Sequence, residues 1–366
     1  MRGLYIHIPF CNKICSYCDF CKMVSSDEIK NKYINRLIEE IKSKKNELID
    51  IDTVYIGGGT PNCLNLELLD KLLKSIEPYL KTSKESTIEL NPDLITIEQI
   101  KLFKKYGINR VSLGVESFNN DTLKIIGRTH TKEIVYEKIK LLKDNGFNNI
   151  NIDLIFGLPN ESLDDIKYNL ICFKELDLNH LSYYSLILED KTIFSYLYNN
   201  KKLELPDDDL VSDMYDYINS FMNDNSYHHY EISNYSKPGY ESIHNMKYWT
   251  EKEYVGIGLN ASGFIKPYRY TNTNIMKEYL NEFKSEKELI DLKSEKNEYL
   301  MLGFRLVDGI KISEYNKLYN SNIFDDFNFD KLLKKKLITI DGDYLKVSPD
   351  KLFVANLVFE EFIDNE

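Results

Sequence analysis

The sequence predicts an α/β protein in which a six-stranded parallel sheet is followed by a mixed C-terminal region. From Gly3 to about Leu188, short β-branched runs alternate with longer amphipathic runs, and this alternation then stops. Alternating strands and helices form parallel sheets with right-handed crossovers. Six such units fit a partial (β/α)6 barrel, and the pattern alone leaves a doubly wound open sheet as the alternative.

The six expected strands are short runs rich in β-branched residues, each followed by a polar or glycine-containing segment. They cover residues 4–8, 53–56, 87–90, 110–115, 149–156 and 181–186. Between them, apolar residues recur at three-and-four spacing, which is typical of a helix with one buried face. The clearest examples are Ile34, Leu37, Ile38 and Ile41, and then Val135, Ile139 and Leu142.

Two further regions follow the predicted barrel, which we assign to residues 1–205. Residues 206–283 begin with an aspartate-rich cap and a helix to about Asn225, and continue as an irregular tyrosine-rich stretch. Residues 284–366 are mainly helical, with two short strands between 338 and 347 that flank Gly342 and a last helix from Pro349. Helices followed by a hairpin predict a winged-helix-like module.

Charge and hydropathy exclude several classes of partner. The chain has 366 residues, is 43% hydrophobic and carries a formal net charge of −11, which works against binding to nucleic acid or an anionic bilayer. No uninterrupted apolar stretch reaches the roughly 18 residues of a spanning helix. We therefore expect a cytoplasmic protein whose winged-helix-like module packs or contacts proteins and does not bind DNA.

Three cysteines lie close together directly after the first predicted strand. Cys11, Cys15 and Cys18 are separated by three and then two residues, so their thiolates can converge on one inorganic centre. A [4Fe–4S] cubane held by three thiolates keeps one iron without a protein ligand, as a reactive metal site requires. A structural zinc site with Cys21 or His7 as fourth ligand is the alternative. A disulfide framework is disfavoured, because the chain has only six cysteines and shows no signal peptide.

Polar groups and glycines follow the other predicted strands. The second strand runs into Gly57-Gly58-Gly59-Thr60, where missing side chains allow close approach of a ligand. Three carboxylates, Glu89, Glu116 and Asp153, lie at later strand ends, where a barrel mouth would bury them. Buried carboxylates need partners, and we expect Arg128 to provide one.

The cysteine spacing, with Tyr17 two residues after Cys15, resembles the signature of the radical S-adenosylmethionine (SAM) superfamily. The lead-in from Tyr5 to Phe10 resembles the coproporphyrinogen III dehydrogenases and the HemW-type haem chaperones of that superfamily. The dehydrogenases have a fourth cysteine where this chain has Phe20, so the resemblance favours the chaperones. It implies a radical-SAM barrel, a cluster on the three cysteines, and SAM contacts by Tyr5, Tyr17, Gly58, Gly59, Thr60, Glu89, Glu116, Arg128, Asp153 and Ala261.

A second motif lies in the tyrosine-rich region. His244-Asn245-Met246-Lys247-Tyr248-Trp249 matches the His-Asn-x-x-Tyr-Trp pattern of the haem chaperones. Imidazole is a common axial ligand of haem iron, and tyrosine and tryptophan rings offer flat faces to a porphyrin. We therefore expect His244, Tyr248 and Trp249 at a haem site, although such residues also occur in ordinary cores.

The resemblance implies a haem chaperone that binds a [4Fe–4S] cluster, SAM and haem, and delivers haem to a recipient protein, which can be membrane-associated. An electron donor such as a flavodoxin or ferredoxin is a further implied partner. Two alternatives stay open at this point. One is an oxygen-independent coproporphyrinogen III dehydrogenase, and the other is a cluster-bearing scaffold without SAM turnover. The sequence assigns no catalytic residue.

Overall fold

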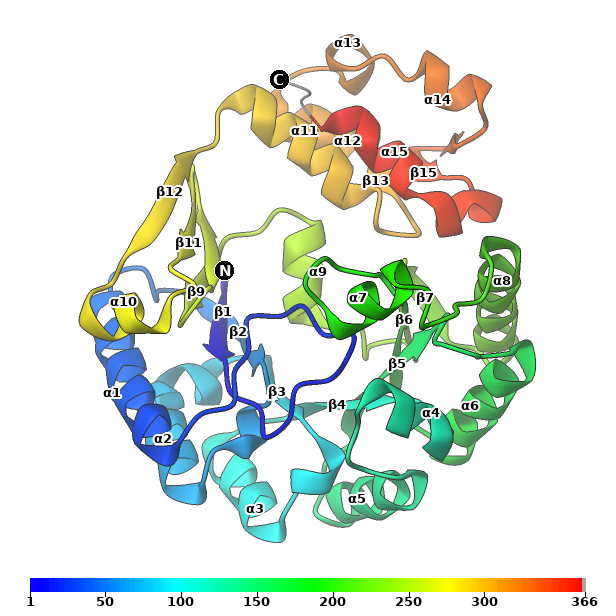
Figure 1. Cartoon of the computed structure of the whole chain (residues 1–366). Coiled ribbons are helices and arrows are strands. Elements are labelled where there is room, and N and C mark those ends of the chain that lie inside the picture. Colours follow the sequence, from blue (N-terminus) through cyan, green and yellow to red (C-terminus); the bar gives the residue numbers. More distant parts are fainter. Residues whose placement is uncertain (364–366) are drawn as a thin grey trace.

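Twelve strands form one curved sheet in the computed structural model, which describes residues 1–363 (Figure 1). Its six central strands are parallel and adjacent in sequence order: β1 (Arg2–Ile8), β2 (Ile51–Gly58), β3 (Glu85–Leu90), β4 (Arg110–Glu116), β5 (Asn149–Phe156) and β6 (His180–Ser185). A doubly wound sheet would reverse its strand order at one point. The sequential order therefore confirms the partial barrel.

Helices follow the strands and form a ring around the outside of the sheet (Figure 1). They are α1 (Asp27–Ser43), α2 (Leu66–Thr82), α3 (Ile97–Tyr106), α4 (Asn120–Ile126), α5 (Lys132–Asp144) and α6 (Leu163–Glu175). Local sequence sets their ends. In α3, Thr96 and Gln99 form a capping box, and Gly107 ends the helix at φ 89°, a conformation that glycine adopts without strain.

Shorter strands extend the sheet at both edges. β9 (Tyr254–Ile257) pairs in parallel with β1, and the antiparallel strands β10 (Ser262–Ile265), β11 (Tyr268–Asn272) and β12 (Ser285–Leu289) follow. At the other edge, β6 pairs with β8 (Asn234–Ser236), which pairs with β7 (His228–Glu231). The expectation of an irregular stretch from 226 to 270 was wrong, because these residues form short antiparallel strand pairs that β1 and β6 anchor at the two edges of the sheet. The three-part division of the chain stays a prediction.

Four helices accompany the added strands: α7 (Ile193–Asn199), α8 (Asp208–Asp224), α9 (Ile243–Trp249) and α10 (Met276–Asn281). The expected aspartate cap is present, since the Asp207 side chain accepts a hydrogen bond from the Leu210 amide at the start of α8. Within residues 1–363, no helix combines the length and apolar character needed to cross a membrane.

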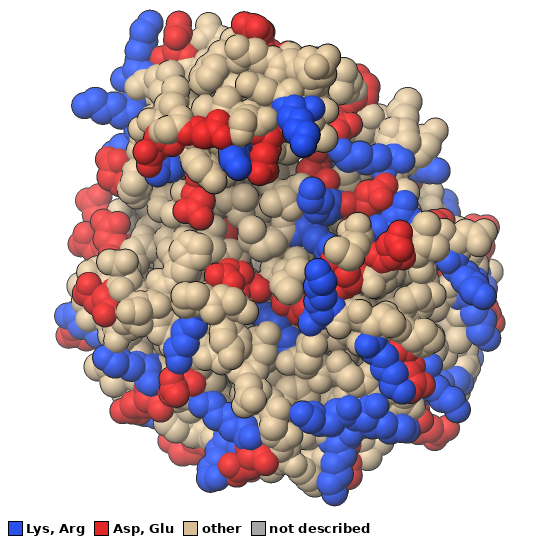
Figure 2. Space-filling view, turned by 180° about the vertical axis from the view of Figure 1, so that it is seen from behind, with Lys and Arg blue, Asp and Glu red and all other residues tan. Residues whose placement is uncertain are grey.

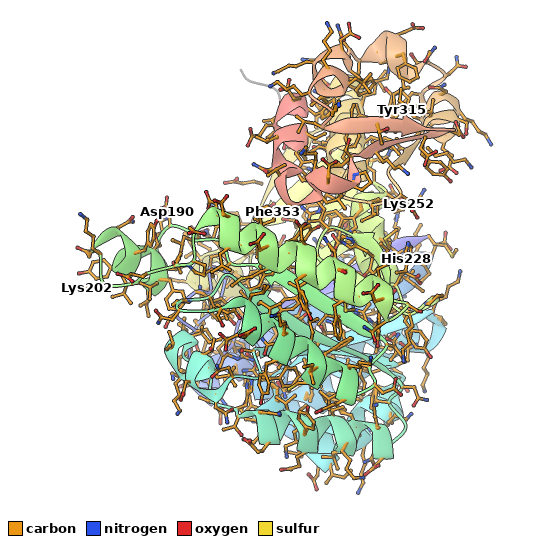
Figure 3. The ribbon with its side chains drawn as sticks, turned by 90° about the vertical axis from the view of Figure 1, so that its right-hand side faces the viewer. Asp190, Lys202, His228, Lys252, Tyr315 and Phe353 are labelled. Atoms are coloured by element: carbon orange, nitrogen blue, oxygen red, sulfur yellow. The ribbon has the colours of Figure 1, made fainter. Side chains whose placement is uncertain are left out.

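The C-terminal module contains α11 (Leu292–Gly303), α12 (Ile312–Tyr319), α13 (Ile323–Asp326), α14 (Asp330–Lys334) and α15 (Asn356–Phe359). The expected hairpin is formed by β14 (Ile338–Asp341) and β15 (Tyr344–Val347), and β13 (Ile310–Lys311) completes a three-stranded sheet. The last helix, expected from Pro349, begins there as a 3₁₀-helix to Val354, and α15 follows it. Figure 3 shows this module standing above α8 and the barrel.

Candidate functional site

The cysteine loop lies at the carboxyl ends of the parallel strands, where barrel proteins place their chemistry. Thr60 Oγ1 lies 3.4 Å from Cys11 Sγ, and Arg128 Nη1 lies 3.6 Å from Cys15 Sγ. The Ser16 amide donates to the carbonyl of Ile126 in α4. The loop is therefore tied to residues that follow β2 and β4.

The three cysteines fit an iron–sulfur cluster by their chemistry. All are free thiols, with Cys11 buried and Cys15 and Cys18 half-buried. In the described part of the chain, no set of three or more His, Cys, Asp or Glu side chains is arranged to hold a single metal ion. A cubane distributes three thiolates over three iron atoms, so it needs a wider arrangement than one ion does. The assignment of Cys11, Cys15 and Cys18 as cluster ligands stays a prediction.

The glycine segment after β2 packs tightly against its own protein. A Cβ on Gly58, which has φ 114°, would lie 2.6 Å from the His7 ring, and a Cβ on Gly59 would lie 2.8 Å from the Phe10 carbonyl and 3.0 Å from Cys11 Sγ. These contacts already explain why the segment lacks side chains. Contact of Gly58, Gly59 and Thr60 with SAM stays a prediction.

A hydrogen-bonded chain links β1 to the end of the cysteine loop. His7 Nε2 donates to the carbonyl of Cys21 at 2.8 Å, so Nδ1 accepts from the Tyr5 hydroxyl at 2.9 Å. Both ring nitrogens of His7 are therefore engaged, and burial lowers its pKa. As described, His7 has no free nitrogen for a metal.

Glu89 lies below the glycine segment and holds it. Its carboxylate accepts from the Tyr55 hydroxyl at 2.9 Å and from the Gly58 amide at 2.9 Å. Burial, reinforced by the nearby Asp153 carboxylate, raises the pKa of Glu89 to about 7. Glu89 is thus poised to change its protonation state near neutral pH.

Glu116 ends β4 at a bulge with φ 66°, a conformation that is uncommon outside glycine. The bulge places its carboxylate 3.9 Å from Arg128 Nη1 and beside Tyr17, and burial raises the pKa of Glu116 to about 7. Arg128 also donates to Asn91 Oδ1 at 3.1 Å and to the Gly114 carbonyl. The predicted residues Tyr17, Glu116 and Arg128 are thus together beside Cys15.

Arg128 is not, however, the common partner of the three carboxylates. Asp153 instead accepts from Ser112 at 3.0 Å and Asn151 at 2.8 Å. Burial raises the pKa of both Asp153 and Glu89, and Arg110 is the cation that partly offsets this rise. Sequence reasoning missed Arg110, which is 1% exposed inside the barrel. The available signal was an arginine at the first position of an otherwise apolar predicted strand.

A second missed residue, Glu40 of α1, holds the loop that contains Ala261. Its carboxylate accepts from the Gly258 amide at 3.0 Å, Asn272 Nδ2 at 2.8 Å and the Tyr279 hydroxyl at 2.6 Å. The same loop contains Asn260 at φ 58°. Asparagine tolerates this left-handed conformation, so this position does not need glycine.

His244 lies away from the cysteine loop. Its ring is within 2.9 Å of Thr53 Oγ1 through Nδ1 and of the Tyr248 hydroxyl through Nε2, and its side chain is buried. Thr53 pairs with Gly3 near the beginning of β1, whereas the cysteine loop follows the end of that strand. His244 therefore has no unengaged nitrogen for haem iron as described, and its role in haem binding stays a prediction.

Trp249 comes at the end of α9, next to the C-terminal module. The Arg305 guanidinium lies 4.3 Å from the centre of its indole ring, in a cation–π contact. The Arg305 carbonyl accepts from the Ile232 amide, and the Val307 amide donates to the Tyr230 carbonyl. Trp249 thus belongs to the junction between the barrel and the module.

Comparisons with known proteins agree with this arrangement. Residues 5–169 match the model of the radical SAM superfamily, and residues 290–353 match that of the HemN C-terminal domain. The haem chaperone HemW of Lactococcus lactis is 40% identical, over 99% of this chain and 97% of the relative, and that of Bacillus subtilis is 35% identical over 99% of each. The solved structure of coproporphyrinogen III oxidase (HemN) from Escherichia coli matches 99% of this chain and 90% of its own, with a TM-score of 0.84 at 21% identity, which shows a shared fold.

Proposed function

This chain belongs to the HemW family of the radical SAM superfamily, and from that premise we propose that it is a haem chaperone. It binds a [4Fe–4S] cluster, SAM and haem, and passes haem to a recipient protein. The observation that carries the cluster and SAM assignments is the position of Cys11, Cys15 and Cys18 beside Arg128 and Glu116 at the carboxyl ends of the barrel strands. The relatives' name supports the haem assignment.

Cys11, Cys15 and Cys18 would hold the cluster, which supplies an open iron site and an electron when reduced. Thr60 and Arg128 lie against two of the sulfurs and would stabilise thiolate charge. We assign SAM contacts to Tyr5, Tyr17, Gly58, Gly59, Thr60, Glu89, Glu116, Arg128, Asp153 and Ala261. Among these, Glu116 and Arg128 are the pair able to bind charged groups of a ligand at the barrel mouth.

The partners follow from this function. Reduction of the cluster requires an electron donor such as a flavodoxin or ferredoxin. Delivery of haem requires a recipient haem protein, which can be membrane-associated. Phe20, at the position of the dehydrogenases' fourth cysteine, is 66% exposed and offers no thiol. We therefore expect no conversion of coproporphyrinogen III.

The test is anaerobic reconstitution of the cluster, followed by parallel measurements on the same protein. Haem binding is measured by titration with hemin at the Soret band, and turnover by product analysis with coproporphyrinogen III, SAM and a reductant. We expect stoichiometric haem binding and no protoporphyrinogen IX. Multiple turnovers of coproporphyrinogen III would show that the protein is a dehydrogenase and not a chaperone. If the protein neither binds hemin nor converts coproporphyrinogen III, the scaffold alternative is favoured.

A further inference from the structure

A pocket of about 810 Å³ lies at the junction between the barrel sheet and the C-terminal module. This volume is within the range of about 300–1,000 Å³ that is typical of small-molecule sites, which also occur preferentially between structural units. The barrel side of the wall comes from Met1, from residues 249–253 at and after the end of α9, and from Lys266. The module side comes from α11, α12, β13 and β15.

The pocket walls include flat and apolar side chains. Trp249, the only tryptophan of the chain, lies on the barrel side, and Tyr299 and Tyr344 lie on the module side. Leu318 and Tyr344 are 54% and 39% exposed, so they present apolar surface to the pocket. A broad aromatic ring system would bury these surfaces.

The charges of the pocket favour an anionic ligand. Each acidic residue on its wall already has a basic partner: Glu251 lies 3.5 Å from Lys266, Glu253 lies 2.9 Å from Arg2, and Glu314 lies 3.4 Å from Lys311. Two lysines remain. Lys252 and Lys317 make no ion pair with a carboxylate within residues 1–363, and Figure 3 shows Lys252 where the module meets the barrel.

The rear face of the molecule provides the comparison. Figure 2 shows acidic and basic side chains interspersed over it. In the junction pocket, by contrast, the acidic side chains are already paired, and Lys252 and Lys317 leave an excess of positive charge on an aromatic-walled surface. Their chemistry matches a planar apolar ligand that carries two carboxylates.

We infer that this junction pocket is where the protein binds haem, with the porphyrin ring beside Trp249 and Tyr344 and the two propionates toward Lys252 and Lys317. The inference rests on the proposed function, because the ligand is the cargo named there. It places haem at the beginning of β1 and the cysteine loop after its end. Seven strand residues separate the two sites by on the order of 20 Å.

The test uses full-length protein with the cluster reconstituted, and hemin as the probe. In the double variant Lys252→Glu/Lys317→Glu we expect the Kd for hemin to rise at least about fivefold at low ionic strength, and the difference to shrink as salt is added. The matched control is Lys101→Glu/Lys174→Glu, which makes the same charge change on the outer helices α3 and α6. Hemin dimethyl ester, which lacks free propionates, should bind all three proteins alike.

A second variant keeps the test independent of the lysines. Leu318→Glu places a carboxylate on an exposed part of the pocket wall, where it cannot disturb the core, and should also weaken hemin binding while the iron–sulfur absorbance stays unchanged. If both pocket variants bind hemin as tightly as the wild type, the pocket assignment is overturned and the proposed function survives. If the wild type itself binds no hemin, the proposed function fails.

Discussion

Glu40 offers the sharpest test of how the site is held together. Its side chain is 1% exposed and satisfies three buried donors, the Gly258 amide, Asn272 Nδ2 and the Tyr279 hydroxyl. Replacing it by alanine leaves the Gly258 amide and the Tyr279 hydroxyl without an acceptor, and Asn272 Nδ2 keeps only the Gly258 carbonyl. Each lost acceptor costs about 1–3 kcal/mol. Allowing for partial rescue by water, we expect Glu40→Ala to lower the free energy of unfolding by about 3–5 kcal/mol.

Glu39→Ala is the matched control, because Glu39 is the neighbouring residue of the same helix. Its side chain is 58% exposed and pairs only with Arg36 on the surface, so we expect a change below about 0.5 kcal/mol. Urea denaturation followed by circular dichroism measures both, and SAM binding to reconstituted Glu40→Ala should weaken because the Ala261 loop loses its anchor. If the two variants agree within about 1 kcal/mol, the Glu40 network does not hold the loop.

The remaining predictions concern the cysteine loop and the charged residues beside it. Iron and sulfide analysis should show that the cluster is lost in Cys11→Ser, Cys15→Ser and Cys18→Ser and kept in Cys21→Ser. A cluster that is retained in Cys18→Ser and lost in Cys21→Ser would refute the assignment of the three ligands. Calorimetry should show weaker SAM binding in Glu116→Ala and Arg128→Ala at unchanged cluster content, whereas unchanged affinity in both would make them structural. Because the pKa of Glu116 rises from 4.5 to about 7 on folding, the folded chain binds the extra proton between these values and the free energy of unfolding falls as pH rises through them. Glu116→Gln should reduce that fall in urea titrations at a series of pH values, and an unaltered slope would contradict the raised pKa.

The barrel could be predicted because its signals are local. Each parallel strand has a β-branched run and a polar end, and each helix has a repeating apolar face, so alternation alone located all six strands to within a few residues. Strands β7 to β11 could not be predicted in this way. They are three to five residues long, and β9 is stabilised by β1, about 250 positions earlier in the chain.

The sequence predicted many residues of the site, but not which of them interact with one another. The strand ends located Glu89 and Glu116 at one edge of the sheet, but the sequence could not show which carboxylate lies beside which cation, because that depends on the bulge at the end of β4. Glu40 was overlooked although a signal existed. It follows Leu37 by three residues and Tyr33 by seven, so it lies on the buried face of α1 and not on the solvent face that its charge suggested.

The position of β1 inside the sheet has a consequence for the order of events during synthesis. The amino-terminal strand pairs on one side with β2, and on the other side with β9, which the ribosome makes about 250 residues later. At roughly 5–20 residues per second, one edge of β1 stays unpaired for about 10–50 s after the cysteines have emerged. The sheet can therefore close at this edge of β1 only after about two thirds of the chain has been made, so a cluster inserted before that point would enter a barrel that is still open.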